Sequence, residues 1–173
     1  MKKCLIVVDY QVDFVTGSLG NPAAAALEAG IASRIRQARN QGEDVIFTLD
    51  THEADYLSTR EGRYLPVPHC IRGTAGHGLY GAVAEECQAG DTVLCKDTFG
   101  SRALLACLQE KRYDAIELCG VVTNICVISN AVLAKAALPE ADICVNAALC
   151  ASNDASLHQK ALDVMASLQI DII

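Results

Sequence analysis

Residues 115–126 read AIELCGVVTNIC, an apolar run that ends at a glycine and leads into a helical pattern. A short, nearly continuous apolar run between turn signals is typical of a strand that is covered on both faces. A helix that starts directly after such a strand is typical of alternating α/β folds. The segment therefore predicts a buried strand, a turn and the first turn of a helix.

The same alternation continues in both directions along the chain. The expected strands are Cys4–Val8, Asp44–Leu49, Thr92–Cys95, Ala115–Cys119, Asp142–Val145 and Gln169–Ile172. The expected helices are Pro22–Gln41, Leu79–Cys87, Ser101–Lys111, Thr123–Leu138 and Asp154–Leu168. This order predicts a three-layer, doubly wound, Rossmann-like α/β fold with six mostly parallel strands and helices on both faces. A length of 173 residues without a linker or a repeat predicts a single domain over residues 1–173.

Composition and charge exclude several classes of protein. The formal net charge of −7 argues against a nucleic-acid partner, because phosphate binding needs clustered Lys and Arg. No apolar stretch approaches the roughly 20 residues of a membrane span, and the N-terminal apolar run ends early, at Asp9. Nine cysteines, several inside apolar runs and none in a Cys-x-x-Cys pair, favour reduced, buried thiols over a disulfide framework. We therefore expect a cytoplasmic protein without a membrane or nucleic-acid partner.

Reactive side chains follow the predicted strands. Asp9, Asp50 and Lys96 come at the ends of the first three strands, and Cys126 lies at the start of the helix after the fourth. Ligands of open α/β sheets bind at the carboxyl ends of the strands. A helix N-terminus and a nearby lysine favour a thiolate, Asp9 could accept the thiol proton, and the N–H groups of residues 120–126 could bind an oxyanion. The alternative is that Cys126 is one more core cysteine.

A second group of polar residues follows the second strand. Asp50 and His52 are two positions apart and point the same way, and His69 lies between stiff, proline-flanked backbone segments. Glu61 lies in the same long segment. Carboxylates together with imidazoles suit zinc, iron or manganese rather than magnesium or calcium. The alternative is that these histidines are ordinary surface residues of a loop.

The chain resembles the isochorismatase-like cysteine hydrolases, and within them the nicotinamidase-like branch, nearly from end to end. The resemblance lies in five blocks in the same order: Asp9–Phe14, Asp50–His52, Pro68–Gly76, Lys96–Phe99 and Gly120–Cys126. It implies an enzyme whose catalytic triad is Asp9, Lys96 and Cys126. It also implies a cis peptide between Val121 and Val122, which in the family directs backbone N–H groups of Val122 and Cys126 into an oxyanion hole.

The resemblance also carries a metal site. The metal ligands of the nicotinamidase-like branch fall on Asp50, His52 and His69, and Glu61 matches an additional glutamate of some members. This implies a divalent metal, with zinc favoured and iron or manganese as alternatives.

The substrate pocket departs from the family pattern. Many nicotinamidases place a tryptophan shortly before the proline–histidine block, and this chain contains no tryptophan. Tyr64 and Leu65 occupy that stretch, and Phe14 could supply one aromatic face of the pocket.

Three functions follow from these residues. The first is hydrolysis of a small carboxamide, with nicotinamide favoured, through a thioester to nicotinate and ammonia. The second is a carbamoyl or ureido hydrolase with the same triad, and the third is a non-catalytic module that binds a ligand or metal. A content of 51% hydrophobic residues and an apolar helix over residues 127–138 also predict a homo-oligomer, although that helix face could pack within the chain.

Overall fold

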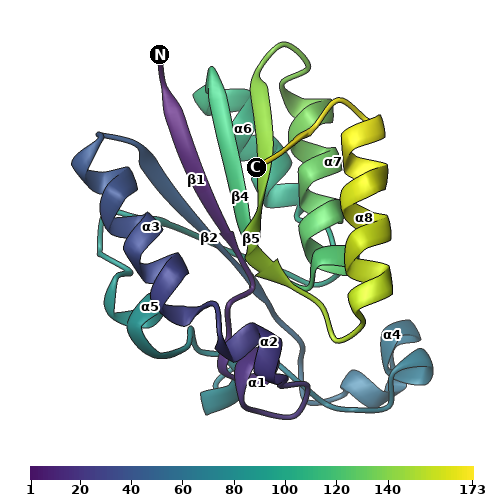
Figure 1. Ribbon diagram of the computed structural model, residues 1–173. Coiled ribbons are helices and arrows are strands. Elements are labelled where there is room, and N and C mark those ends of the chain that lie inside the picture. Colours follow the sequence, from purple (N-terminus) through teal and green to yellow (C-terminus); the bar gives the residue numbers. More distant parts are fainter.

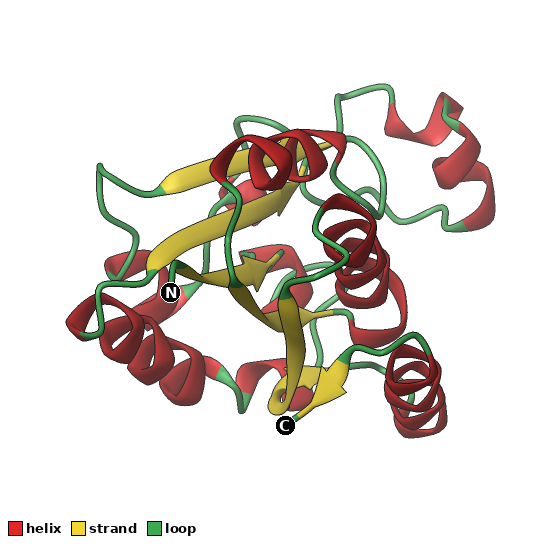
Figure 2. Ribbon diagram, turned by 90° about the horizontal axis from the view of Figure 1, so that it is seen from above, coloured by secondary structure: helices red, strands yellow, loops and turns green.

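The computed structural model describes residues 1–173 and contains one sheet of six strands, in the order β3-β2-β1-β4-β5-β6 (Figures 1 and 2). Every neighbouring pair of strands is parallel. The strands are β1 (Lys3–Val8), β2 (Asp44–Asp50), β3 (Thr92–Lys96), β4 (Ala115–Val121), β5 (Asp142–Ala151) and β6 (Asp171–Ile172). The predicted α/β fold is confirmed, and all six predicted strands are present.

Helices cover both faces of the sheet (Figure 1). They are α1 (Val12–Val15), α2 (Pro22–Ala25), α3 (Glu28–Asn40), α4 (Arg60–Tyr64), α5 (Gly81–Glu85), α6 (Arg102–Lys111), α7 (Ile128–Ala137) and α8 (Ala155–Ser167). Single helical turns lie at Tyr56–Ser58, Ala75–His77 and Thr123–Val127. Because side chains alternate along a strand, Leu5 and Val7 pack with α3 and α5, whereas Ile6 and Val8 pack with α6, α7 and α8.

The predicted helix Pro22–Gln41 is in fact two helices, α2 and α3. The Ala24 carbonyl accepts hydrogen bonds from the Tyr10 hydroxyl at 2.7 Å and from the Leu27 N–H at 3.1 Å. In a continuous α-helix this carbonyl would instead accept from residue 28. The break places α2 beside α1 near the carboxyl ends of the strands, while α3 runs along the sheet (Figure 1).

Two other elements differ from the sequence prediction, one in its length and one in its type of helix. β5 was expected to stop at Val145 but continues to Ala151, because its pairing with β4 resumes after an irregularity between Leu118 and Gly120. The predicted helix Thr123–Leu138 begins with a π-helical turn over Thr123–Val127, and α7 follows it. Both differences lie next to Cys126, so they shape the turn that carries it.

All nine cysteines are free thiols. Cys4 and Cys119 are buried in the sheet as expected, but Cys95 is exposed and Cys144 is only half-buried. Cys95 lies on the edge strand β3, where exposed and partly buried residues alternate because one face of the strand has no cover.

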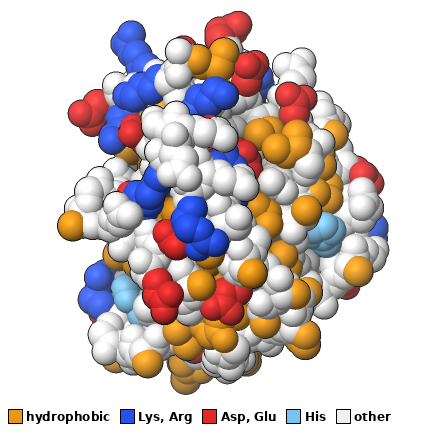
Figure 3. Space-filling view, turned by 60° about the vertical axis from the view of Figure 1, so that its left-hand side comes forward, with side chains coloured by type: hydrophobic (Ala, Val, Ile, Leu, Met, Phe, Trp, Pro, Cys, Tyr) orange, Lys and Arg blue, Asp and Glu red, His pale blue; other side chains and the backbone are white.

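Charges of both signs are interspersed on the face of the molecule drawn in Figure 3. Figure 3 shows Lys and Arg side chains beside Asp and Glu rather than in one basic patch. Several arginines of α3 are paired: Arg36 with Glu86 at 2.7 Å and Arg39 with Asp91 at 2.6 Å. No helix has both the length and the apolar character that a membrane crossing requires.

Gly120 lies near the end of β4, beside Val8 of β1 and just before the turn that carries Cys126. Its φ is +117°, and an added Cβ would lie 2.1 Å from the Val8 carbonyl oxygen. Strain at such a φ and overpacking of a core each cost about 1–3 kcal/mol, so Gly120→Ala should lower the free energy of unfolding by about 2–6 kcal/mol. Urea unfolding measures the loss. Gly90→Ala is the matched control, because its added Cβ meets nothing within 4 Å, and equal stabilities of the two variants would contradict this account.

Candidate active site

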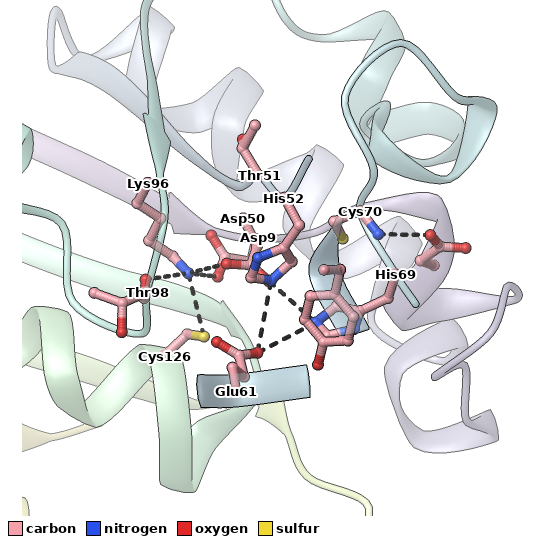
Figure 4. A network of polar contacts seen from close by, with 12 residues as sticks. Asp9, Asp50, Thr51, His52, Glu61, His69, Cys70, Lys96, Thr98 and Cys126 are labelled. Atoms are coloured by element: carbon pink, nitrogen blue, oxygen red, sulfur yellow. Dashed lines mark hydrogen bonds and ion pairs between the residues drawn. The ribbon is translucent and has the colours of Figure 1, made fainter. Parts of the chain in front are cut away.

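The ends of three neighbouring strands bring Asp9, Asp50 and Lys96 together (Figure 4). Lys96 Nζ lies 2.7 Å from Asp9 Oδ2 and 3.0 Å from Asp50 Oδ1. It also donates a hydrogen bond to the Thr98 carbonyl at 3.0 Å. All three charged side chains are buried. Burial of an unpaired charge is costly. Here the ammonium of Lys96 lies between the carboxylates of Asp9 and Asp50, so the opposite charges offset part of that cost.

Cys126 joins this cluster from the π-helical turn that follows β4. Its Sγ lies 3.4 Å from Lys96 Nζ, and the residue is only 4% exposed. Asp9 Oδ1 accepts a hydrogen bond from the Thr48 hydroxyl at 2.7 Å, which fixes the carboxylate between Thr48 and Lys96. The structure therefore brings together the three residues that the sequence suggested as a triad.

Burial opposes the effect of the helix start and Lys96, which were expected to favour the thiolate form of Cys126. Burial raises the pKa of the Cys126 thiol well above its ordinary value, and the Asp9 carboxylate acts in the same direction while Lys96 opposes it. Burial likewise raises the pKa of Asp9. Burial alone would lower the pKa of Lys96, but Asp9, Cys126 and Asp50 raise it, so the ammonium stays charged. Burial and Asp9 thus oppose ionisation of the Cys126 thiol, whereas the Lys96 ammonium favours it.

Four donor groups converge beside the triad. Asp50 Oδ2 lies 3.1 Å from His52 Nε2 and 3.3 Å from His69 Nε2, and Glu61 Oε1 lies 3.6 Å from each of these nitrogens. All four donor atoms lie within 4.8 Å of one another. Around one ion with bonds of about 2.1 Å, donors are roughly 3.4 Å apart, so these residues fit a divalent metal. Two imidazoles and two carboxylates suit zinc, iron or manganese.

Neighbouring groups orient these donors. His69 Nδ1 contacts the Val67 carbonyl at 2.8 Å, and an N–H at Nδ1 leaves the Nε2 lone pair free for a metal. The Gln11 side chain accepts from the Asp50 N–H at 2.7 Å and donates to the Asp50 carbonyl at 2.9 Å. The Tyr56 ring lies 4.7 Å from the ring of His52 and 5.0 Å from that of His69. Gln11 and Tyr56 had no predicted role, because side chains that support metal ligands leave no spacing pattern in the sequence.

One cavity of about 270 Å³ reaches both the thiol and the donor cluster. The cluster contributes Asp50, Glu61 and His69, and the apolar walls come from Phe14, Leu19, Leu65, Phe99, Val122, Ile125 and Leu157. The other polar residues of its lining are Asn124, Ser152, Asn153 and Asp154. A largely apolar cavity with a few convergent polar groups is typical of a small-molecule site.

The aromatic walls of the cavity differ from the expectation. Phe14 and Leu65 line it as expected, but Tyr64 does not, since it is 77% exposed and lies beside Arg60, whose guanidinium is 5.2 Å from its ring centroid. Tyr64 is the last residue of the short helix α4 and points away from the cavity. Phe99 takes the place of a second aromatic wall. Phe99 lies in the block Lys96–Phe99, one of the five that carry the family resemblance. Its place in that block could have identified it as a candidate pocket residue.

The peptide between Val121 and Val122 is cis. Val122 and Cys126 both line the cavity, so the backbone segment expected to hold an oxyanion borders the place where a substrate would lie. The Thr123 hydroxyl contacts His158 Nδ1 at 2.9 Å, which ties the turn to α8.

Known proteins resemble this chain over nearly its whole length. A family model described as an isochorismatase domain matches residues 3–173. The Bacillus subtilis protein named "Uncharacterized isochorismatase family protein PncA" is 31% identical over 144 residues, which are 76% of this chain and 78% of that protein. The structure of a pyrazinamidase/nicotinamidase from Streptococcus mutans is 32% identical, with a TM-score of 0.89, over 99% of this chain and 100% of that one. The structure of the nicotinamidase/pyrazinamidase PncA from Bacillus subtilis is 31% identical, with a TM-score of 0.88, over 99% of both chains.

Proposed function

The chain belongs to the isochorismatase family of hydrolases, and from this premise we propose that it hydrolyses small aromatic carboxamides, with nicotinamide as the favoured substrate. One observation carries the proposal: Cys126, which contacts the buried Lys96–Asp9 ion pair, lines the same cavity as Asp50, Glu61 and His69 of the metal-type donor cluster. A nucleophile with an adjacent base and a charged partner is the arrangement that covalent hydrolysis of an amide requires.

The chain's own residues account for both halves of the reaction. Asp9 takes the proton of Cys126 as the sulfur attacks the amide carbon, and Lys96 stabilises the resulting negative charges in a dry site. Backbone N–H groups of the turn that carries Val122 and Cys126 stabilise the tetrahedral oxyanion. The proton then passes to the leaving nitrogen, ammonia departs, and a thioester remains on Cys126. Asp9 removes a proton from water, which hydrolyses the thioester and restores the thiol.

The donor cluster defines the other end of the substrate. Asp50, His52, His69 and Glu61 would hold a divalent metal, with zinc favoured by the two imidazoles. When bound, such a metal supplies a Lewis acid that can bind a nitrogen of an aromatic ring. Phe14 and Phe99 provide apolar walls for that ring, so a flat heteroaromatic amide matches the cavity better than a flexible ureido acid.

An ammonia-release assay tests the proposed substrate. The panel contains nicotinamide, pyrazinamide, benzamide and an N-carbamoyl amino acid. Because benzamide lacks the ring nitrogen, nicotinamide should exceed it in kcat/KM by at least about 100-fold. Preferred turnover of the N-carbamoyl amino acid would refute the aromatic substrate and leave a cysteine hydrolase. Absence of turnover with the whole panel, by protein loaded with zinc, would refute the proposed function.

A further inference from the structure

A buried amide lies one helical turn after the nucleophile. Asn130 of α7 is 0% exposed. Its Nδ2 donates to the Cys126 carbonyl at 2.8 Å and to the Phe99 carbonyl at 3.1 Å, and its Oδ1 accepts from the Ser101 N–H at 2.9 Å. Both N–H groups of the amide are therefore used, and the oxygen has a partner. The Asn130 side chain thus connects the backbone of Cys126 to the loop that carries Phe99, the residue that forms one wall of the cavity.

These bonds close a ring around the reacting sulfur. Lys96 Nζ binds the Thr98 carbonyl at 3.0 Å, and the next carbonyl, that of Phe99, is bound by Asn130. Asn130 in turn binds the Cys126 carbonyl, and Cys126 Sγ lies 3.4 Å from Lys96 Nζ. Because each link is a direct hydrogen bond or short contact, the position of Asn130 affects the distance between the sulfur and the ammonium.

We infer that Asn130 is a positioning residue, which holds the Cys126 turn against Lys96 and holds Phe99 against the substrate. The inference deepens the proposed function and rests on it for its kinetic readouts. Asn130 lies in the same apolar core as Ala131 and Ala134, where a purely apolar side chain would fill the space. A fully satisfied buried polar network instead selects one arrangement of the groups that it joins.

Two substitutions separate the two tasks of Asn130. Asn130→Asp keeps the size and can still accept from Ser101, but a carboxylate cannot donate to the carbonyls of Cys126 and Phe99. Asn130→Ser supplies a hydroxyl, which in a helix can donate to the carbonyl four residues earlier, here Cys126. The serine side chain is too short to replace the bond to Phe99. The aspartate variant therefore loses both tasks, and the serine variant loses only the task that concerns Phe99.

The kinetics of the zinc-loaded full chain should reflect this separation. A misplaced nucleophile lowers kcat by about 100-fold in Asn130→Asp. Asn130→Ser should recover most of that loss in kcat but keep a KM raised about tenfold, because the aromatic wall is released. Met165→Ala is the matched control, since Met165 is a fully buried residue of the same core on α8 and does not line the cavity. It should lower the melting temperature and leave kcat and KM unchanged.

Specific outcomes overturn the inference. It fails if Asn130→Asp retains the kcat of the control, or if Asn130→Ser has no higher kcat than Asn130→Asp. Should Asn130→Asp not fold, Asn130→Ser decides alone: a raised KM with nearly unchanged kcat supports the inference, and an unchanged KM overturns it.

A readout without substrate distinguishes failure of this inference from failure of the proposed function. Iodoacetamide alkylation of Cys126, followed by peptide mass spectrometry, should slow about tenfold in Asn130→Asp, because the sulfur loses the charged partner that stabilises its anion. The rate should recover in Asn130→Ser. An unchanged or faster rate in Asn130→Asp overturns the inference, even if the wild-type chain hydrolyses no amide of the panel.

Discussion

Cys126→Ala should lower kcat/KM for amide hydrolysis by at least about 10⁴-fold, because no other side chain can form the thioester. The fold should persist, since removal of one buried sulfur atom costs only about 1 kcal/mol. Ammonia release measures the activity, and circular dichroism with thermal unfolding measures the fold. Cys126→Ser should be similarly inactive, because the hydroxyl is far less nucleophilic than the thiol at the same site.

The other eight cysteines provide the control for this result. Cys95 is the exposed thiol of the edge strand, and Cys95→Ala should retain full activity. Acid quenching during turnover, followed by peptide mass spectrometry, should detect an acyl group on Cys126 alone. Activity that survives in Cys126→Ala, or an acyl group on another cysteine, would show that the sulfur beside Lys96 is not the nucleophile.

The fold was predictable because its inner strands are buried on both faces. Such strands have nearly continuous apolar sequences, and the inner strands β1 and β4 were found almost to their ends. The misses come from tertiary contacts. The Tyr10 hydroxyl interrupts the helical run after Pro22, and the pairing of Gly120 with Cys150 extends β5 beyond its apolar start. Neither contact has a local signal, because each partner lies far away in the sequence.

The candidate site was predictable only in part. Asp9, Asp50 and Lys96 follow strands, and topology alone brings strand ends together. The contribution of each pocket residue depends on side-chain direction, which spacing does not give, so Tyr64 was expected in the cavity and Phe99 was not assigned. The pKa of Cys126 also depends on its burial, which raises it and which the sequence does not reveal, so the sequence indicated only the opposing influence of the helix start and Lys96.

His52→Ala should remove most of the bound metal and lower kcat/KM for nicotinamide by at least about 100-fold, comparable to losses when the ligand of a catalytic ion is removed. The His52 nitrogen lies 3.1 Å from Asp50 Oδ2 and 3.6 Å from Glu61 Oε1, so its loss opens one side of the donor cluster. Elemental analysis of the purified protein should give about one equivalent of a divalent metal in the wild type. His77→Ala is the matched control, because His77 lies in the same long segment but outside the cluster, with its ring 2.8 Å from the Thr51 hydroxyl.

Stability gives a second readout of the metal that does not depend on turnover. A metal that binds only the folded chain stabilises it by about 2.7 kcal/mol at a concentration 100-fold above its dissociation constant. Zinc added to the chelated wild type and to His77→Ala should therefore raise the melting temperature, and the rise should vanish in His52→Ala. Glu61→Gln should keep part of this rise in melting temperature, since Glu61 is the most exposed of the four donors and lies on the short helix α4.

Chelators that leave both the melting temperature and ammonia release unchanged would exclude a metal from catalysis. The cysteine hydrolase would remain, because Lys96 contacts both Asp9 and Cys126 without the histidine nitrogens of the donor cluster.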